Sequence, residues 1–518
     1  MRLLRLIGKA RKVRSSRAAV RWLFLRALGA VYLIAFTSLR VQVLGLYGSR
    51  GIQPVRELLA ALRAQEGRRA YRLAPSLLWL GSSDRDLVGL CRAGQVCSLA
   101  LLAGVAPGPM SAASWALYLS FVTVGRDFLS FQWDGLLLET GLHATLVTTP
   151  RSARGTRAGQ PPWLGSVLMR WLAFRLHFQS GLVKLQSRDA TWRRLTACTY
   201  HYETQPLPTR LGWYAHHLPR PLQQVSTAAA LAIELGAPFL GFAPRPLRKF
   251  GFSALTGLQA LIAATGNYAF FNVLSVALTS WALDDDSFSV LRRLARVSRR
   301  PARQPRGTLA RAVGRIAYGA LAGPLAVAST VTFAAHLRRR PLRMRLTALD
   351  RLIDPFRSVN AYGLFAVMTT ARPEIVVEGS NDGVAWREYP FRYKPSRPED
   401  APRTVAPHQP RLDWQMWFAA LSRRPPPWFA AFLARLLEGS PDVLKLLGAN
   451  PFPDRPPRYV RALLYEYRMT DLETKRRTGA WWQRELIGTY FPAAMERGAS
   501  PRSRSPLASG LKRKERTR

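Results

Sequence analysis

Ionisable side chains inside two neighbouring apolar stretches of the chain are the first candidates for chemistry. The set comprises Asp134, Glu139 and His143 in residues 128–148, and Arg170, His177 and Lys184 in residues 163–186. Glu139 stands four residues before His143, which makes the two neighbours on a helix and allows them to serve as a general acid and base. Such a couple would support a membrane enzyme, or a cavity that holds a lipid, a quinone or a polar headgroup.

The same side chains also fit a structural role. Arg170, His177 and Lys184 are seven residues apart, so they form one stripe along a helix. An acidic helix beside a basic helix predicts ion pairs between the two, because polar side chains commonly join helices inside a membrane. We therefore expect interhelical ion pairs and keep the catalytic or lipid-binding cavity as the alternative.

Residues 191–219 form a second group, rich in tryptophan, tyrosine, histidine and proline. Its candidate metal ligands are His201, Glu203, His216 and His217. The adjacent His216 and His217 diverge on any regular element, and no H-E-x-x-H or C-x-x-C motif accompanies them. We predict neither a metal site nor a cofactor here, and expect an ordered aromatic element at the membrane surface, beneath the C-terminal domain.

The sequence also lacks motifs that would define a catalyst. It contains no G-x-S-x-G elbow, so the chain is not itself a lipase, and no glycine-rich phosphate loop. Its three cysteines, Cys91, Cys97 and Cys198, include no C-x-x-C pair and exclude a disulfide framework.

Nine apolar segments are long enough, or nearly so, to cross a hydrocarbon layer of roughly 30 Å. They lie near residues 22–44, 87–105, 110–124, 128–148, 163–186, 222–243, 247–264, 267–283 and 316–337. The predicted fold is thus an α-helical multi-pass membrane bundle of about nine spans, followed by a soluble α+β domain. The predicted boundaries are a basic cytoplasmic N-terminus (1–21), a transmembrane domain (22–340), an extracytoplasmic domain (350–495) and a disordered basic tail (496–518).

The net charge of +45 does not indicate a nucleic-acid-binding protein. The basic residues occupy short loops between apolar segments, as the positive-inside bias predicts, and no single folded module carries them. With the N-terminus inside, the alternate loops that begin near residues 149, 244 and 285 are strongly basic. This pattern places the chain beyond about residue 340 outside the cytoplasm.

The C-terminal region has the character of a folded α+β domain. Residues 374–391 alternate around Asn381-Asp382-Gly383, which predicts a β-hairpin. Residues 428–437 and 442–447 have helical spacing, and residues 459–467 predict another strand. The proposed surface for a client protein combines a polar, proline-containing loop with nearby aromatic residues: His408, Gln409, Arg411, Trp414 and Trp417. The alternative for the tryptophans is a place in the domain's own core.

Several ordered blocks resemble the lipase maturation factor family. Residues 196–219 read TACTYHYETQPLPTRLGWYAHHLP, and the residues that carry the likeness are Tyr200, His201, Glu203, Trp213, Tyr214, His216 and His217. Further matching blocks are 45–54, 131–141, 265–272, 376–383, 406–417 and 450–454. We call residues 191–219 the signature segment.

The resemblance implies a multi-pass protein that assists folding, assembly or export of secreted lipases, with its C-terminal domain on the lumenal side of the endoplasmic reticulum in eukaryotes. The arginine- and alanine-rich composition suggests a bacterial member in the inner membrane, with this domain in the periplasm. The implied partners are membrane lipids and a secreted lipase or other exported client, but no nucleic acid. The chain is expected to act as a maturation factor and not as a catalyst.

Overall fold

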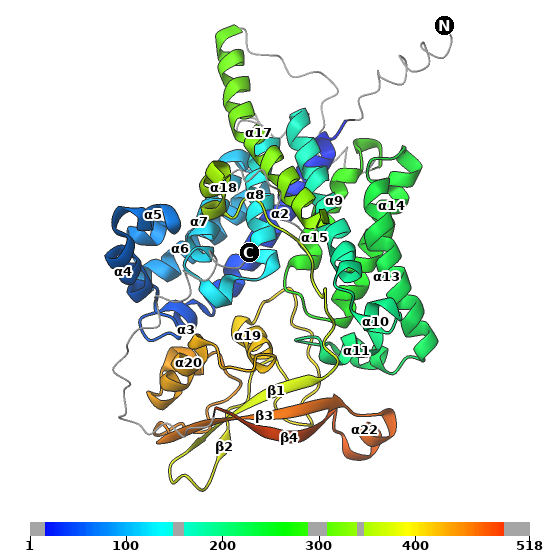
Figure 1. Cartoon of the computed structure of the whole chain (residues 1–518). Coiled ribbons are helices and arrows are strands. Elements are labelled where there is room, and N and C mark those ends of the chain that lie inside the picture. The colour runs from blue at the N-terminus through cyan, green and yellow to red at the C-terminus, as the bar shows by residue number, and fades with distance from the viewer. Residues whose placement is uncertain (1–15, 149–159, 288–307, 339–346, 492–518) are drawn as a thin grey trace.

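The computed structural model describes residues 16–148, 160–287, 308–338 and 347–491. A helical domain is followed by a smaller domain built on an antiparallel sheet (Figure 1). The predicted tail (496–518), most of the predicted N-terminal segment, and parts of two basic loops lie outside the described residues.

A helix coincides with each of the nine predicted apolar segments. These helices are α2 (Ala18–Arg40), α6 (Asp84–Ala103), α7 (Pro107–Val122), α8 (Gln132–Val147), α9 (Trp163–Gln186), α13 (Arg220–Leu240), α14 (Arg245–Thr265), α15 (Phe271–Thr279) and α17 (Thr308–Arg338). Shorter helices connect them: α3 (Val43–Tyr47), α4 (Val55–Glu66), α5 (Ala70–Leu73), α10 (Ala190–Arg193), α11 (Ala197–Thr204), α12 (Arg210–His216) and α18 (Thr347–Ile353).

The count of nine membrane spans is not confirmed. Among the described residues, three helices are long and apolar enough to cross a membrane: α2, α6 and residues Tyr318–Arg338 of α17. Helices α7 and α8 have 16 residues each, or about 24 Å of rise, which is short of the hydrocarbon thickness. Helix α9 is long enough but has three basic side chains, Arg170, Arg175 and Lys184.

The C-terminal domain contains a four-stranded antiparallel sheet in the order β2-β1-β3-β4. The strands are β1 (Arg372–Ser380), β2 (Arg387–Glu388), β3 (Tyr459–Met469) and β4 (Trp482–Phe491), and the helices are α19 (Arg411–Ala420), α20 (Pro427–Leu437), α21 (Pro441–Leu444) and α22 (Leu472–Thr478). The predicted hairpin is confirmed as β1–β2, with Gly383 at a φ of 77° in its turn. Strand β4 was not anticipated from the sequence.

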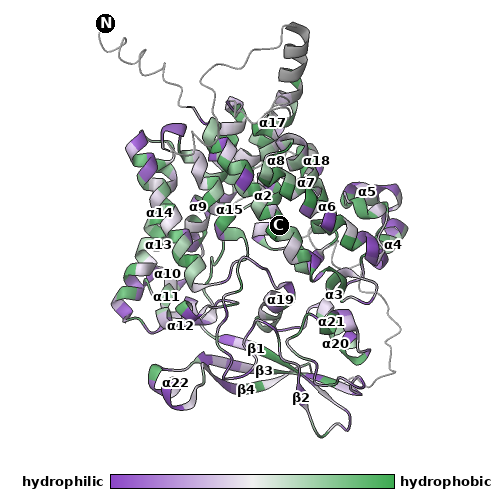
Figure 2. Ribbon diagram, turned by 180° about the vertical axis from the view of Figure 1, so that it is seen from behind, coloured by the Kyte–Doolittle hydropathy of each residue, from purple (hydrophilic) through white to green (hydrophobic). Residues whose placement is uncertain are grey.

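One hydrophobic core runs through both domains. It includes Phe24 of α2 and Leu136 of α8 together with Ile375 of β1, Phe432 of α20 and Val460 of β3. Helices α19 and α20 lie between the sheet and the helical domain (Figure 1). The helices of the bundle are mainly hydrophobic, whereas hydrophilic residues gather on the outlying α4 and α5 (Figure 2). The domain boundary is therefore a packed seam.

Candidate functional site: the seam between the two domains

A buried ion pair joins the two domains. Arg411, the first residue of α19, donates from Nη1 and Nη2 to the two carboxylate oxygens of Asp134, both at 3.0 Å. Each side chain is 1% exposed. Asp134 lies in the first turn of α8, where the helix dipole favours a negative charge. Arg411 also donates to the carbonyl of Phe128 at 2.6 Å, and the Tyr118 hydroxyl donates to Asp134.

The loop before α19 is tied to α2 and α8. The amide of Gln409 donates to Ser38 Oγ at 3.0 Å, and Gln42 Nε2 donates to the Gln409 carbonyl at 2.8 Å. Trp133 Nε1 donates to Gln409 Oε1 at 2.6 Å, and His408 Nδ1 lies 2.9 Å from Ser38 Oγ. His408 is partly buried, and Gln409 is fully buried. The expectation that this loop is an exposed client surface is wrong, because its polar groups find their hydrogen-bond partners in the helical domain.

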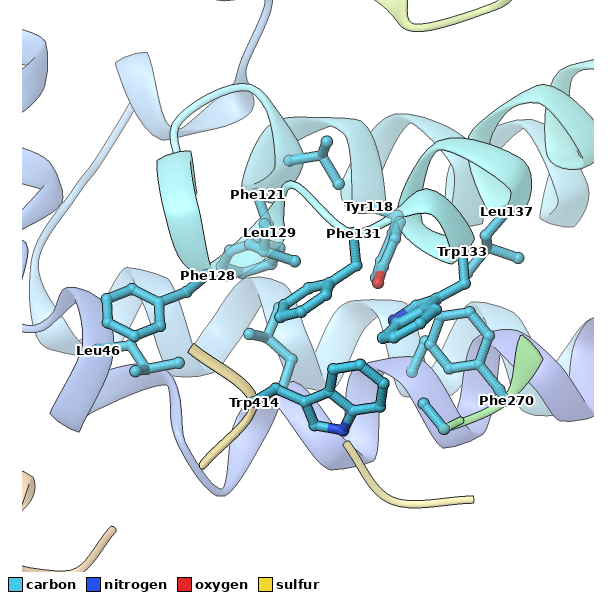
Figure 3. Close-up of a cluster of buried hydrophobic side chains, with 14 of the residues drawn as sticks. Leu46, Tyr118, Phe121, Phe128, Leu129, Phe131, Trp133, Leu137, Phe270 and Trp414 are labelled. Carbon is cyan, nitrogen blue, oxygen red and sulfur yellow. The ribbon is translucent and has the colours of Figure 1, made fainter. Parts of the chain in front are cut away.

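The two tryptophans assigned to that surface are also buried. Trp414 packs edge-on against Trp133, with ring centroids 4.8 Å apart, and against Phe131 at 5.7 Å. Figure 3 shows these three rings gathered beside Tyr118. Trp417 donates from Nε1 to the Thr204 carbonyl at 2.9 Å. Trp414 and Trp417 therefore lie in the core, which was the alternative considered for these tryptophans.

Glu139 connects α8 to α9 and to the linker between the domains. Arg175 of α9 donates to its carboxylate and also to the Asn360 carbonyl, the latter at 3.0 Å. The second carboxylate oxygen accepts from the Tyr362 hydroxyl at 2.6 Å and from the Asn360 amide at 2.9 Å. The expected ion pair between the acidic and basic helices is present. Its cation is Arg175, which is not one of the three basic residues named from the sequence.

The three basic residues named from the sequence, Arg170, His177 and Lys184, each contact a different partner. Lys184 pairs with Glu234 of α13, His177 lies 2.9 Å from the Thr279 hydroxyl, and Arg170 donates to the Gly241 carbonyl at 2.7 Å. The ring nitrogens of His143 have no hydrogen-bond partner within the described chain, so His143 is not hydrogen-bonded to Glu139 as the alternative of an acid-base couple would require. The cavity beside Arg170 and His177 is about 20 Å³, which is about the room that one water molecule needs.

The signature segment folds into α11 and α12 and packs against the sheet. Trp213 of α12 is fully buried among Tyr467, Met469 and Trp482. His217 Nε2 lies 2.9 Å from the Thr470 carbonyl. Arg372 of β1 donates to the carbonyls of Glu203, Gln205 and Pro206, which lie within a stretch of four residues.

Other polar residues of the signature segment also make contacts with the surrounding chain. Glu203 Oε1 accepts from the Met469 amide at 2.6 Å and lies 4.0 Å from His216 Nε2. His201 lies 3.2 Å from the Tyr268 hydroxyl, and burial lowers the pKa of His201 to about 4. Tyr200 packs partly buried beside Trp192, whereas Tyr214 is exposed. In the described ranges, no group of three or more His, Cys, Asp or Glu side chains is placed to hold a metal ion.

The contacts described above also use residues that the sequence did not single out: Ser38, Gln42, Arg175, Glu234, Asn360, Tyr362 and Arg372. Arg175 and Glu234 had a usable signal, because a charged residue inside an apolar helical segment requires a partner. The others lie in loops, near the end of α2 or, for Arg372, at the start of β1, so nothing in their local sequence marks them.

A helical membrane domain, with a sheet domain joined to it by a buried ion pair and a shared core, defines a two-domain integral membrane protein. Residues 19–290 match the family model described as the lipase maturation factor transmembrane domain, and residues 358–492 match the lipase maturation factor C-terminal domain. The chain belongs to the lipase maturation factor family.

Curated relatives cover nearly the whole chain. It is 37% identical to lipase maturation factor 2 of Gallus gallus, over 91% of this chain and 81% of the relative. It is 36% identical to lipase maturation factor 2 of Homo sapiens, with coverage of 91% and 82%. Lipase maturation factor 1 of Bos taurus is 31% identical, with coverage of 92% and 90%. No solved structure matches the chain.

Proposed function

We propose that this protein assists the folding, assembly or export of secreted proteins such as lipases. The observation that carries the proposal is that the similarity to lipase maturation factors extends over both domains, 19–290 and 358–492. The seam joins these same two domains into one packed body through the pair Asp134–Arg411.

We infer that the C-terminal domain lies outside the cytoplasm, in the periplasm of a bacterial host or the lumen of the endoplasmic reticulum in a eukaryotic one. The basic loops support this orientation. The start of α2 and the sheet also lie at opposite ends of the helical domain (Figure 1). Asp285 accepts hydrogen bonds from the amides of Ala18, Ala19 and Val20 at that first end, near the basic pair Arg245 and Arg248 that binds Asp284.

The proposed role is non-catalytic. Among the intramembrane charges, Asp134, Glu139 and Lys184 have opposite charges as partners and are buried, and the six residues first considered as one cluster divide among separate contacts. Buried, mutually paired charges favour a structural role over the alternative of a membrane enzyme or a lipid- or quinone-handling protein.

The test is a secretion assay in a host whose own copy of the gene has been deleted. A secreted lipase is expressed with and without this chain, and the secreted activity is measured per amount of lipase protein. We expect the chain to raise this specific activity, and photo-crosslinking from the C-terminal domain to recover the lipase. Unchanged specific activity, together with no secreted protein among the crosslinked products, would refute the proposal. A changed lipid or quinone profile in a Glu139→Ala strain with normal secretion would favour the alternative.

A further inference from the structure

A basic cleft opens where the signature segment meets the C-terminal domain. Its volume is about 400 Å³, and it lies between Pro208 and the chain from Pro390 to Arg403. Arg392, Arg397 and Arg403 line it and are exposed.

Of the cations that line this cleft, Lys394 is paired with Glu374 at 3.0 Å, whereas Arg397 and Arg403 are not neutralised by their surroundings. Asp400 is the one acidic residue in the lining, and its carboxylate accepts from the amides of Ser396 and Arg397. Within the described chain, the guanidinium groups of Arg397 and Arg403 make no hydrogen bond or ion pair. Two exposed arginines that line a concave surface, and whose guanidinium groups have no acceptor, are available to an anionic ligand.

The cleft is the middle part of a longer trough. It shares Arg392 and Tyr393 with a hollow of about 290 Å³ that reaches Val41, just beyond the end of α2. It shares Arg397 with a third hollow of about 610 Å³ at β2, whose lining also contains Arg387, Glu388, Glu399 and Arg484. Arg484 is paired there with Glu388 at 2.8 Å. The lining residues therefore trace a path from the end of α2 to β2.

The walls of the central cleft suit a polypeptide. Tyr393, partly buried, and Phe391, 6% exposed, lie in the walls, and the prolines at 208, 390, 395 and 402 hold the surrounding backbone in fixed conformations. A pre-organised wall loses little conformational entropy when it binds a chain. A lipid headgroup would occupy only the end of the trough beside α2, and would leave unused Arg397, which the cleft shares with the hollow at β2.

We propose that this trough binds an extended acidic segment of the client polypeptide. Carboxylates of the segment accept bidentate hydrogen bonds from Arg397 and Arg403, and its apolar side chains lie against the rings and prolines. The inference rests on the proposed function and names the chemistry by which the C-terminal domain would select its client.

The direct test uses the purified full-length protein in detergent and a fluorescently labelled peptide of glutamate, alanine and proline. Fluorescence anisotropy should show binding that weakens as salt is added, while the matched lysine peptide does not bind. The double variant Arg397→Glu/Arg403→Glu should bind the acidic peptide at least about tenfold more weakly, because two attractive contacts become repulsive.

The matched control is Arg423→Glu/Arg424→Glu, which reverses two exposed arginines elsewhere in the same domain and should bind like the wild type. Equal losses in both double variants, equal binding of the acidic and lysine peptides, or no peptide binding at all would overturn the inference. Binding of vesicles that contain anionic lipid, reduced by the trough variant, with no binding of the peptide, would overturn it in favour of a headgroup site.

The secretion assay separates this inference from the proposed function. If deletion of the chain lowers the specific activity of the lipase but the trough variant restores it fully, the client does not use the trough and the proposed function stands. If deletion has no effect, the proposed function fails and the assignment of a client segment fails with it. Loss of activity in the trough variant but not in the Arg423→Glu/Arg424→Glu control supports both.

Discussion

The guanidinium of Arg411 and the carboxylate of Asp134 form a bidentate pair across the seam, with both N–O distances at 3.0 Å and both side chains buried. The pair joins residues 277 positions apart in the chain. It is a contact by which the C-terminal domain is held in one orientation on the helical domain.

Removal of Arg411 should strongly destabilise the protein. Arg411→Ala leaves Asp134 as a buried charge without its partner, which typically costs about 3–5 kcal/mol of unfolding free energy. Thermal unfolding in detergent measures the loss. The exposed control Arg423→Ala should stay within about 0.5 kcal/mol of the wild type. The double variant Arg411→Met/Asp134→Leu should recover most of the loss, because no unpaired charge remains; a double variant less stable than Arg411→Ala would contradict this account.

Loss of Glu139 should release the linker between the domains. Glu139→Ala removes the acceptor for Tyr362 and for the Asn360 amide, so the chain around these residues loses its anchor on α8. We expect faster tryptic cleavage after the exposed Arg357, followed by mass spectrometry of the fragments. Glu57→Ala, at an exposed position on α4, is the control and should leave the cleavage rate unchanged. Equal rates in all three proteins would show that Glu139 does not hold the linker.

Gly212 should tolerate no side chain. A Cβ at this position of α12 would overlap the Thr265 carbonyl of α14, which is backbone and cannot move aside cheaply. We expect Gly212→Ala to lower stability by about 1–3 kcal/mol, as overpacking does. Gly236→Ala on α13 is the matched control, because a Cβ there meets nothing within 4 Å and alanine favours the helix. If the thermal midpoint falls in both variants, or in neither, the close approach of Gly212 to the Thr265 carbonyl is not what limits this position.

Asp413 should make stability depend on pH. Burial raises the pKa of Asp413 from 3.8 to about 6, although its carboxylate accepts from the amides of Tyr393 and Lys394. Because the folded pKa lies above the unfolded value, this contribution to stability is fully present below about pH 4 and is lost as the pH rises to about 6.

The variant Asp413→Asn tests this contribution, because it keeps an acceptor for the two amides but cannot titrate. The unfolding free energy of the wild type minus that of the variant should fall between pH 4 and pH 6, and should be constant above that range. A difference that rises over this interval would reverse the assigned sign.

The sequence alone determined most of the elements of the fold, although not strand β4. Apolar runs located a helix at each of the nine predicted positions, and alternation around Asn381-Asp382-Gly383 located the β1–β2 hairpin, because these patterns depend on local periodicity. The motifs of the signature segment also identified the family. The number of spans was less well predicted, since an apolar run reveals a helix but not whether it is long enough to cross the bilayer.

Only the tertiary structure decided which charges meet. The loop at His408–Arg411 was expected to be exposed because it is polar and contains proline, yet it lies against Ser38, Gln42 and Asp134 of the helical domain. Glu139 pairs with Arg175, which is not one of the basic residues named from the sequence. Residues on facing helices meet according to the rotation of each helix, which spacing along one helix does not specify. Polarity shows that a group needs a partner, but whether water or another part of the chain supplies it depends on how distant segments pack.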